Sequence, residues 1–364
     1  MKAFNLESYL SNGVEVIIKG ILKAAAKNPR TALFMMQYAK TSGRARKLRI
    51  DAEGKGEHIP PFLIASITNQ CNLHCKGCYA RANHSCVDGA APDGMLTADE
   101  WKKIFEQAAE LGCGFILLAG GEPLVRQDVL EAAATQKELL FPVFTNGTML
   151  NDKYLKLFSD NPNLIPILSI EGNEAVTDER RGQGIYHQLQ QVMTELKKRG
   201  ILFGASVTVH KNNMAEVLSD EFRGNLSEHS CKAVIYVEYV PISKETEELA
   251  MDDEARDWMG EELNRLRMKT DEMIYISFPG DEKTSGGCLA AGRGFFHINV
   301  YGGAEPCPFS PYSDTSLKDV SLKKALNSPL FLKLRTSGTL MQEHKGGCVL
   351  FEQEKQVKEM AGEA

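Results

Sequence analysis

The chain carries three closely spaced cysteines that suit metal chemistry, in the run Cys71-Asn-Leu-His-Cys75-Lys-Gly-Cys78-Tyr79. A C-x3-C-x2-C loop offers three thiolates and no fourth. A structural zinc site usually has four protein ligands, whereas a cubane iron–sulfur cluster held by three thiolates leaves one iron open. An open iron can bind a substrate, so the loop indicates catalysis rather than structural cross-linking. A redox pair or an accidental trio of cysteines is the alternative.

Size and composition indicate a globular protein. A chain of 364 residues can form one large domain with appendages. Its hydrophobic content of 43% and charged content of 25% are ordinary for such proteins. Nine cysteines are an odd number and do not suggest a secreted disulfide framework. Six of them fall into two groups that suit clusters, so we expect a reducing cytoplasm.

Residues 1–55 are predicted to be a basic, amphipathic helical segment. Residues 1–50 contain ten Lys or Arg and two Glu, a charge of +8, against −14 for the rest of the chain. Apolar residues recur at helical spacing from Val14 to Ala25, and a second helix is expected near Arg30, before the basic run Lys40 to Arg49. Such a segment can contact an anionic membrane or an acidic partner, or it can pack on the main domain. We find no signal peptide and no apolar run of the ~20 residues that span a bilayer.

Residues 56–243 alternate between predicted strands and predicted helices. Short runs rich in Val, Ile and Phe predict six buried parallel strands, at 62–68, 115–121, 141–147, 165–172, 203–209 and 234–241. The first intervening helix opens with Thr97 and Glu100, which have the spacing of a capping box. This α/β order fits a partial (β/α)6 TIM-like barrel. A doubly wound open sheet has the same order of elements, and periodicity alone does not decide between them.

Polar motifs lie at the carboxyl ends of three of the predicted strands. They are Gly120-Gly121-Glu122-Pro123, Thr145-Asn146-Gly147-Thr148 and Ser169-Ile170-Glu171-Gly172. The carboxyl ends of barrel strands form one face, so these motifs should lie near the cysteine loop. Glycines permit close approach of the backbone, and an acceptor-rich turn can bind an ammonium group. Arg180 and Arg181 could pair with a carboxylate there, or could equally be surface residues.

Together these motifs resemble the radical S-adenosylmethionine (radical SAM) superfamily over about residues 60–240. The cysteine loop followed by Tyr79 is similar to its cluster-binding motif, and Gly120–Pro123 to its GGEP motif. The resemblance implies that Cys71, Cys75 and Cys78 bind a [4Fe–4S] cluster whose open iron holds SAM, after the first strand of a partial barrel. It also implies these SAM contacts: Tyr79, Gly120, Gly121, Glu122, Pro123, Thr145, Asn146, Ser169, Glu171 and Arg181.

Residues 244–364 carry a second cysteine group, formed by Cys288, Cys307 and Cys348. A hairpin is predicted between the first two, at 295–301 with a turn at Gly302-Gly303. This pattern resembles the SPASM/twitch extension of the superfamily, which implies an auxiliary [4Fe–4S] cluster bound by these three cysteines. If the resemblance does not hold, they are buried apolar residues.

The extension departs from that pattern in two ways. The spacing from Cys288 to Gly292 is one residue longer than usual, and Phe351 stands where a further cysteine is common. The auxiliary cluster would then have an open iron, or a fourth ligand such as His344 or the distant Cys231. Cys113 is expected in the core and Cys86 in a loop.

The resemblance implies an enzyme that reductively cleaves SAM to a 5′-deoxyadenosyl radical and abstracts hydrogen from a substrate. The auxiliary cluster would transfer an electron or bind the substrate. Expected partners are a reductant such as flavodoxin or ferredoxin and an amphiphilic or anionic substrate, such as a tetrapyrrole or a lipid, with no nucleic acid. The protein would be cytoplasmic, with peripheral membrane contact as an option. A peptide- or protein-modifying maturase and a non-enzymatic iron–sulfur electron carrier are the alternatives.

Overall fold

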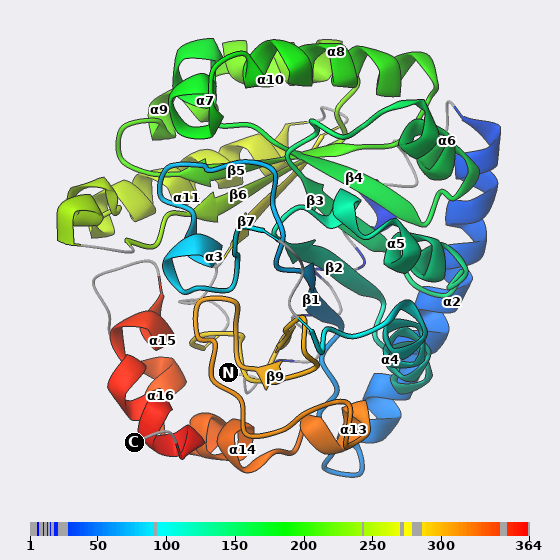
Figure 1. The fold of residues 1–364 in the computed structure, drawn as a ribbon, viewed down its shortest axis with the longest axis vertical. Coiled ribbons are helices and arrows are strands. Elements are labelled where there is room, and N and C mark those ends of the chain that lie inside the picture. The colour runs from blue at the N-terminus through cyan, green and yellow to red at the C-terminus, as the bar shows by residue number, and fades with distance from the viewer. Residues whose placement is uncertain are drawn as a thin grey trace.

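The described part of the chain is built on one nine-stranded sheet. A computed structural model describes residues 28–89, 93–241, 244–269, 273–278, 286–342 and 348–362, with a few positions between 6 and 20. The strand order is β7-β6-β5-β4-β3-β2-β1-β8-β9. All neighbours from β1 to β7 are parallel, β8 is parallel to β1, and β9 is antiparallel to β8. Figure 1 shows these strands fanned around an axis, which confirms the α/β partial barrel.

The strand bounds agree closely with the predicted ones. The first six are β1 Phe62–Thr68, β2 Phe115–Gly120, β3 Phe141–Thr145, β4 Leu164–Ser169, β5 Gly204–Val209 and β6 Ala233–Glu238. The prediction of six parallel strands was incomplete, because β7 (Ile274–Phe278) extends the sheet beside β6. Its sequence, Ile-Tyr-Ile-Ser-Phe, has the β-branched and aromatic residues of a strand. The sheet therefore continues past residue 243 into the predicted extension.

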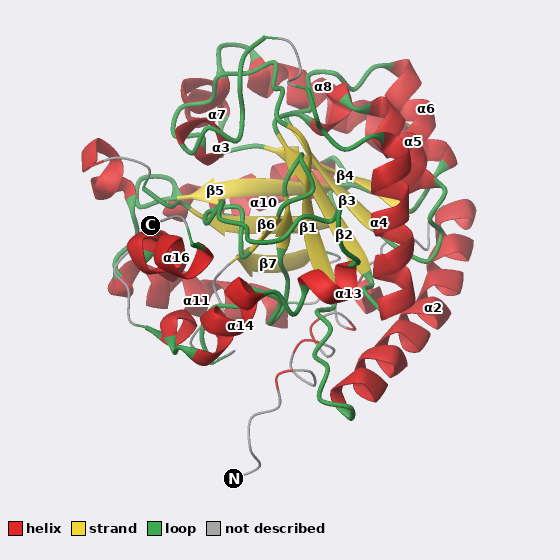
Figure 2. Ribbon diagram, turned by 60° about the horizontal axis from the view of Figure 1, so that its bottom comes forward, coloured by secondary structure: helices red, strands yellow, loops and turns green. Residues whose placement is uncertain are grey.

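Helices cover the outer face of the sheet, as Figures 1 and 2 show for α4, α5, α6 and α8. Between β1 and β7 the chain forms α3 Tyr79–Ala82, α4 Ala98–Leu111, α5 Gln127–Ala134, α6 Asp152–Asp160, α7 Glu174–Arg181, α8 Ile185–Lys198, α9 Met214–Val217, α10 Asp220–Glu228 and α11 Asp253–Met268. Short 3-10 helices occupy Pro123–Val125 and Lys244–Leu249. None of the helices in the described ranges is long and apolar enough to cross a membrane.

Helix α4 begins and ends as its sequence dictates. The Thr97 hydroxyl accepts the N–H of Glu100, and the Glu100 carboxylate accepts the N–H of Thr97 at 2.7 Å, which confirms the capping box. The helix ends at Gly112 with φ of 96°. A side chain at Gly112 would lie 2.6 Å from the carbonyl oxygen of Ala45 in α2, so glycine permits this packing.

The N-terminal region packs against the barrel through α2 (Pro29–Glu53). The predicted second helix is therefore correct but includes the basic run, which had been expected to follow it. On its buried face, Tyr38 donates a hydrogen bond to the Gly114 carbonyl at 2.6 Å. Ile18 belongs to the same apolar cluster as Met35 and Tyr38. Most of the predicted stripe from Val14 to Ala25 lies outside the described residues.

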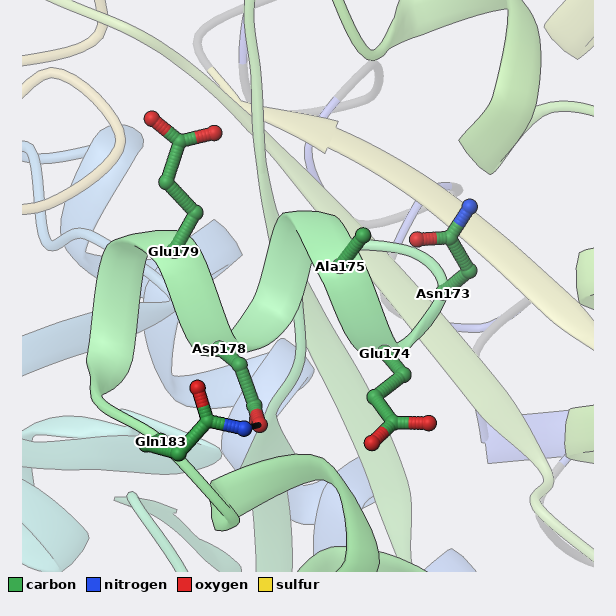
Figure 3. A pocket seen from close by; sticks show the side chains of 6 residues that line it. All are labelled: Asn173, Glu174, Ala175, Asp178, Glu179 and Gln183. Carbon is green, nitrogen blue, oxygen red and sulfur yellow. Dashed lines mark hydrogen bonds between the residues drawn. The ribbon is translucent and has the colours of Figure 1, made fainter.

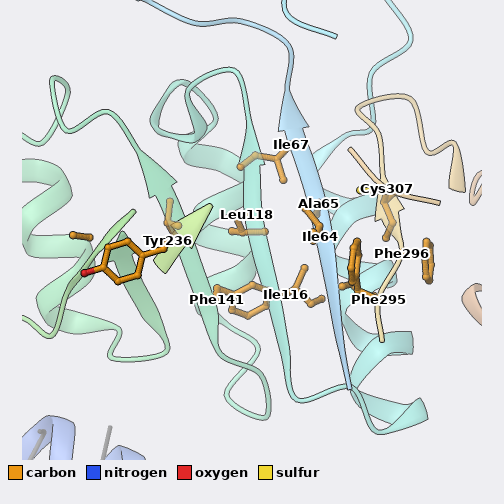
Figure 4. Close-up of a cluster of buried hydrophobic side chains, with 14 of the residues drawn as sticks. Ile64, Ala65, Ile67, Ile116, Leu118, Phe141, Tyr236, Phe295, Phe296 and Cys307 are labelled. Carbon is orange, nitrogen blue, oxygen red and sulfur yellow. The ribbon is translucent and has the colours of Figure 1, made fainter. Parts of the chain in front are cut away.

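The C-terminal segment closes the sheet beside β1. The predicted hairpin is present as β8 (His297–Ile298) and β9 (Ala304–Glu305). It is followed by α13 Leu322–Ala325, α14 Pro329–Thr336, a 3-10 turn Thr339–Met341, α15 Val349–Glu352 and α16 Glu354–Ala361. Figure 4 shows Ile64 and Ala65 of β1 between β2 and the segment that carries Phe295, Phe296 and Cys307. These side chains belong to one continuous apolar core that joins the barrel to the extension.

Candidate functional site

The cysteine loop lies at the carboxyl end of β1 and is tied to the end of α7. The N–H of Lys76 donates to the Arg180 carbonyl at 2.8 Å, and Arg180 Nε donates to the Lys76 carbonyl at 3.1 Å. The next residue, Gly77, has φ of 66° and faces the ring of Tyr239 at the end of β6. A position with such a φ favours glycine, so the loop between Cys75 and Cys78 is sharply turned.

Cys75 lies near the other two thiols of this loop and near two arginines. All three are partly exposed. Burial raises the pKa of Cys75, with Cys78 and Cys71 adding to the rise and the guanidinium groups of Arg181 and Arg180 opposing it. The backbone N–H of Leu73 donates to Cys71 and opposes the rise in its pKa. Cationic groups and N–H donors next to thiols favour the thiolate form that binds iron.

A fourth thiol, Cys86, lies beside Cys71. A hydrogen bond between the two side chains, followed by burial, raises the pKa of Cys71. The N–H of Cys86 donates to the Ala80 carbonyl at 2.7 Å, which holds the Cys86 backbone next to α3. The spacing of the cysteines in the sequence did not predict this contact. The compact turn between Cys78 and Cys86 returns the chain to Cys71.

Glu122 of the GGEP motif is buried and accepts hydrogen bonds from the chain itself. Its carboxylate accepts from the N–H of Leu124 at 3.0 Å, from the Thr145 hydroxyl at 2.7 Å and from the N–H of Asn146 at 2.8 Å. Burial raises the pKa of Glu122, while these donors oppose the rise. The side chain thus joins the end of β2 to the turn after β3. Pro123, also buried, begins the short 3-10 turn that follows.

The two glycines of the motif serve packing against the cysteine loop. A side chain on Gly120 would lie 2.2 Å from the Thr68 carbonyl oxygen, and one on Gly121 would lie 2.1 Å from that of Gln70. The N–H groups of Gly121 and Glu122 donate to these same two carbonyls at 2.8 Å. The sequence reasoning expected the glycines to admit a ligand. In the structure the protein atoms closest to both glycines belong to the base of the cysteine loop, and the contact of these glycines with SAM stays a prediction.

The turn after β3 is bonded to the cysteine loop through asparagines. Asn146 Nδ2 donates to Asn72 Oδ1 at 2.9 Å, and Asn72 Nδ2 donates to the Thr148 hydroxyl at 2.7 Å. That hydroxyl in turn donates to Asn146 Oδ1 at 2.7 Å. Asn72, which the motifs did not single out, is therefore the residue of the loop that fixes it to Thr145–Thr148.

Glu171 is fully buried and binds both arginines of α7. Its carboxylate pairs with Arg180 at 2.8 Å and with Arg181, and it accepts the N–H of Thr208 at 3.0 Å. The surface interpretation of Arg180 and Arg181 was wrong, since both side chains are largely buried. Arg181 Nε is buried and has no hydrogen-bond partner in the described part of the chain. Ser169 ends β4 on the same face and is partly exposed.

The second cysteine group also gathers in space. Cys288, Cys307 and Cys348 are all buried. Burial, followed by a hydrogen bond with Cys348, raises the pKa of Cys307, and Cys288 adds to the rise. The N–H of Phe309 donates to Cys307 and opposes it. Three sulfurs contributed by separate segments therefore meet, as cluster ligands must.

The structure does not bring Cys231 to this group. Cys231 precedes β6, at the amino end of the sheet, and its thiol donates to the Ala233 carbonyl at 3.3 Å. Cys113 is a core residue as predicted, donating to the Pro60 carbonyl at 3.3 Å. The other proposed fourth ligand, His344, lies outside the described residues.

Tyr79 stands between the two cysteine groups. It follows Cys78, and its ring centroid is 4.8 Å from that of Phe309. Burial raises the pKa of Tyr79, and Cys78 and Cys307 both add to the rise. Tyr79 was predicted to contact SAM, and the structure places it in the wall between the two groups.

A buried hydrogen-bonded chain that sequence reasoning missed links β1 to the hairpin. Ser66 Oγ lies 2.7 Å from His297 Nε2, and His297 Nδ1 lies 2.6 Å from Glu305 Oε2. Asn299 Nδ2 donates to Glu305 Oε1 at 2.6 Å. Ser66 lies shortly before the first cysteine loop, and Glu305 lies shortly before Cys307. These hydrogen bonds therefore fix the two cysteine-bearing segments relative to each other.

Each cysteine group offers three thiols, the donors that iron–sulfur clusters use. Within the described ranges, no three Cys, His, Asp or Glu side chains are placed to hold one metal ion. The pocket of about 570 Å³ in Figure 3 lies elsewhere, over α7, and is lined by Asn173, Glu174, Ala175, Asp178, Glu179 and Gln183. It contains no cysteine, and Asp178 there accepts the N–H groups of Gly184 and Tyr186.

Comparisons with known proteins identify the family. A model of the radical SAM superfamily matches residues 65–220. The AdoMet-dependent heme synthase of Methanosarcina barkeri is 30% identical over 328 residues, which cover 81% of this chain and 89% of that protein. The chain belongs to the radical SAM superfamily. It is an enzyme of that superfamily, and membership implies a [4Fe–4S] cluster and SAM, so the electron-carrier alternative is wrong.

Other radical SAM enzymes match over less of their length or only in fold. The PqqA peptide cyclase of Rhizobium meliloti is 29% identical, over 44% of this chain and 42% of that protein. Streptococcus suis SuiB, solved bound to S-adenosylmethionine, superposes with a TM-score of 0.65 at 16% identity, covering 86% of this chain and 79% of SuiB. The fold and the C-terminal extension are thus those of SPASM-type radical SAM enzymes.

Proposed function

We propose that this radical SAM enzyme modifies a tetrapyrrole, using two iron–sulfur clusters. The substrate class is inferred from how much of this chain aligns with one relative. The alignment with the heme synthase covers 81% of this chain, so it must continue beyond residue 243 into the extension. The peptide cyclase match covers 44% of this chain. The extension carries Cys288, Cys307 and Cys348. Similarity to the heme synthase in this extension is therefore better evidence for the substrate class than similarity in the barrel, which all these relatives share.

The catalytic cluster is assigned to Cys71, Cys75 and Cys78. The closeness of Cys75 to the other two thiols and to Arg181 and Arg180 supports this assignment. The bound cluster and SAM supply a 5′-deoxyadenosyl radical for hydrogen abstraction. The chain's part is to hold the loop rigid, through Asn72 on one side and Lys76 on the other.

Arg181 is assigned to the carboxylate of SAM. Glu171 orients its guanidinium group, and Nε remains a buried donor with no partner among the described residues. A buried donor without a partner is costly, and an anion near Cys75 would satisfy it. Glu171 then acts by positioning Arg181, because its own oxygens already accept hydrogen bonds from the chain.

The auxiliary cluster is assigned to Cys288, Cys307 and Cys348. A carbon radical on the substrate must lose one electron to become a closed-shell oxidised product, and a cluster held by these three cysteines would be the acceptor. The contact of Tyr79 with Phe309 supports this closeness. Flavodoxin or ferredoxin would supply the reducing electron, in a cytoplasm that protects both clusters from oxidation.

We also propose peripheral contact with an anionic membrane through α2. Its outward face carries Leu33 and Met36, 59% and 61% exposed, and the exposed Lys40, Arg44 and Lys47 further along. Basic residues beside exposed apolar ones suit an anionic lipid surface. An amphiphilic tetrapyrrole would be presented at such a surface.

Turnover with defined substrates tests the substrate class. The anaerobically reconstituted protein would be mixed with SAM, a reductant and an iron porphyrin deuterated on its propionate side chains. Deuterium in the 5′-deoxyadenosine, with a change in porphyrin mass, is expected. The controls are the ester of the same deuterated porphyrin and a set of short deuterated peptides. Deuterium transfer from one of these peptides, and not from the porphyrin, would assign the enzyme to the peptide-modifying maturases.

A further inference from the structure

Ser310 lies next to the second cysteine group, at the end of a tight turn. The sequence Cys307-Pro308-Phe309-Ser310 is closed by a hydrogen bond from the Ser310 N–H to the Cys307 carbonyl at 2.9 Å. Cys307 and Ser310 form an antiparallel bridge pair. Residues directly opposite each other in such a pair project side chains to the same face, with their Cβ atoms ~5 Å apart. The Ser310 hydroxyl therefore lies on the same face as the Cys307 sulfur.

The Ser310 hydroxyl is buried and lacks a partner. The side chain is 1% exposed, and its Oγ makes no hydrogen bond in the described part of the chain. Most buried hydroxyls are hydrogen-bonded, and an exception calls for an unseen ion, water or ligand. The nearby hydroxyl of Ser313, by contrast, donates to the Thr315 carbonyl at 2.8 Å. Ser310 thus presents an unused oxygen beside three gathered thiols.

Phe351, which has no atom that can bind iron, stands at the position where a further cysteine is common. Phe351 lies on α15 and is 39% exposed. Cys307 and Ser310 have the x2 spacing at which pairs of cysteines bind one metal centre. An oxygen at the second position of such a pair reaches the same centre from the other side of the turn.

We infer that Ser310 Oγ is the fourth ligand of the auxiliary cluster, binding the iron that no cysteine holds. The inference rests on the auxiliary cluster of the proposed function. On binding, the hydroxyl passes its proton to solvent and the resulting alkoxide bonds to iron. This cluster then has no open iron for a substrate, which was one of the alternatives left by the sequence, and it would serve as an electron acceptor.

The test isolates the auxiliary cluster in a protein whose Cys71, Cys75 and Cys78 are all Ala. This background should bind about four irons. In it, Ser310→Cys should keep the iron and raise the midpoint potential, since a hard alkoxide oxygen favours ferric iron more than a soft thiolate does. Ser310→Ala should lose one iron on mild ferricyanide oxidation and give the EPR signal of a three-iron cluster. Ser313→Ala is the matched control and should change neither property.

The possible outcomes separate the two proposals. If the background protein binds no iron, the proposal of an auxiliary cluster is wrong, and so is the assignment of Ser310 as its ligand. Four irons whose EPR spectrum and potential are the same in Ser310→Cys and the unchanged background would leave the cluster in place and overturn Ser310 alone. Two further results would overturn Ser310 as the ligand. One is a three-iron EPR signal from the background protein itself, and the other is a shift of the midpoint potential in His344→Ala but not in Ser310→Cys.

Discussion

The ring of Tyr79, the residue after Cys78, packs against the ring of Phe309, two residues after Cys307, with centroids 4.8 Å apart. The same two segments are joined by a hydrogen bond from Asn83 Nδ2 to the Pro308 carbonyl at 3.1 Å. The two cysteine groups, more than 200 residues apart in sequence, are therefore neighbours across one aromatic contact. This arrangement supports the proposal that an auxiliary cluster lies close enough to the catalytic one to accept an electron from the substrate.

The second group of cysteines should account for half of the iron. Changing Cys288, Cys307 and Cys348 together to Ala is expected to lower iron from about eight to about four atoms per chain, since each cubane holds four irons. SAM cleavage should persist while substrate turnover falls. Cys113→Ala, which removes a core thiol, is the control and should retain all the iron. Unchanged iron in the triple variant would show that these thiols are only packing residues.

Gly121→Ala should disturb the cysteine loop as well as the SAM site. The added methyl group would lie 2.1 Å from the Gln70 carbonyl oxygen, so the backbone at the base of the loop must shift. We expect loss of both iron and SAM affinity, measured by iron analysis and calorimetry. Gly260→Ala, on α11 with nothing within 4 Å, is the control and should be neutral or slightly stabilising. Normal iron with weakened SAM binding would instead mean that the ligand approaches this glycine.

Glu122→Gln should loosen the turn after β3. An amide has one acceptor oxygen, so it cannot satisfy the three donors from Leu124, Thr145 and Asn146 that the carboxylate accepts. Leaving such donors unpaired costs about 1–3 kcal/mol in the free energy of unfolding. Thermal denaturation and SAM titration measure the two effects. Glu110→Gln, on the exposed face of α4, is the control, and equal stability of the two variants would contradict the bridging role.

The outward face of α2 should bind anionic vesicles. Co-sedimentation with vesicles containing phosphatidylserine is expected at low salt and should weaken at about 0.5 M salt, because charge interactions are screened. Lys40→Glu combined with Lys47→Glu should abolish it. Lys102→Glu on α4 is the matched control. If the wild-type protein stays in the supernatant at low salt, the membrane proposal fails and α2 serves only as packing.

Local features of this fold were readable from the sequence. The capping box at Thr97, the bounds of β1 and the Gly302 turn depend on residues close together in the chain, and each was predicted correctly. The cysteine loop was recognisable for the same reason. Strand β7 also had a local signal, but the expectation of six units left no place for it.

Contacts between distant segments were not readable. Asn72 and Thr148 are 76 residues apart, and Ser66 and His297 are 231 apart. Nothing in either local sequence specifies such partners, because the packing of the whole barrel creates them. The link from Glu122 to Thr145 and Asn146 was missed for this reason, whereas its predicted contact with SAM stays a prediction.

Reductive cleavage of SAM tests the central claim most directly, that Cys71, Cys75 and Cys78 hold the catalytic cluster. The anaerobically reconstituted wild-type protein, reduced with dithionite, is expected to convert SAM to 5′-deoxyadenosine and methionine. The variant with all three changed to Ala should form none and should keep about four irons, while Cys231→Ala should match the wild type. Formation of 5′-deoxyadenosine by the triple variant at the wild-type rate would contradict the account.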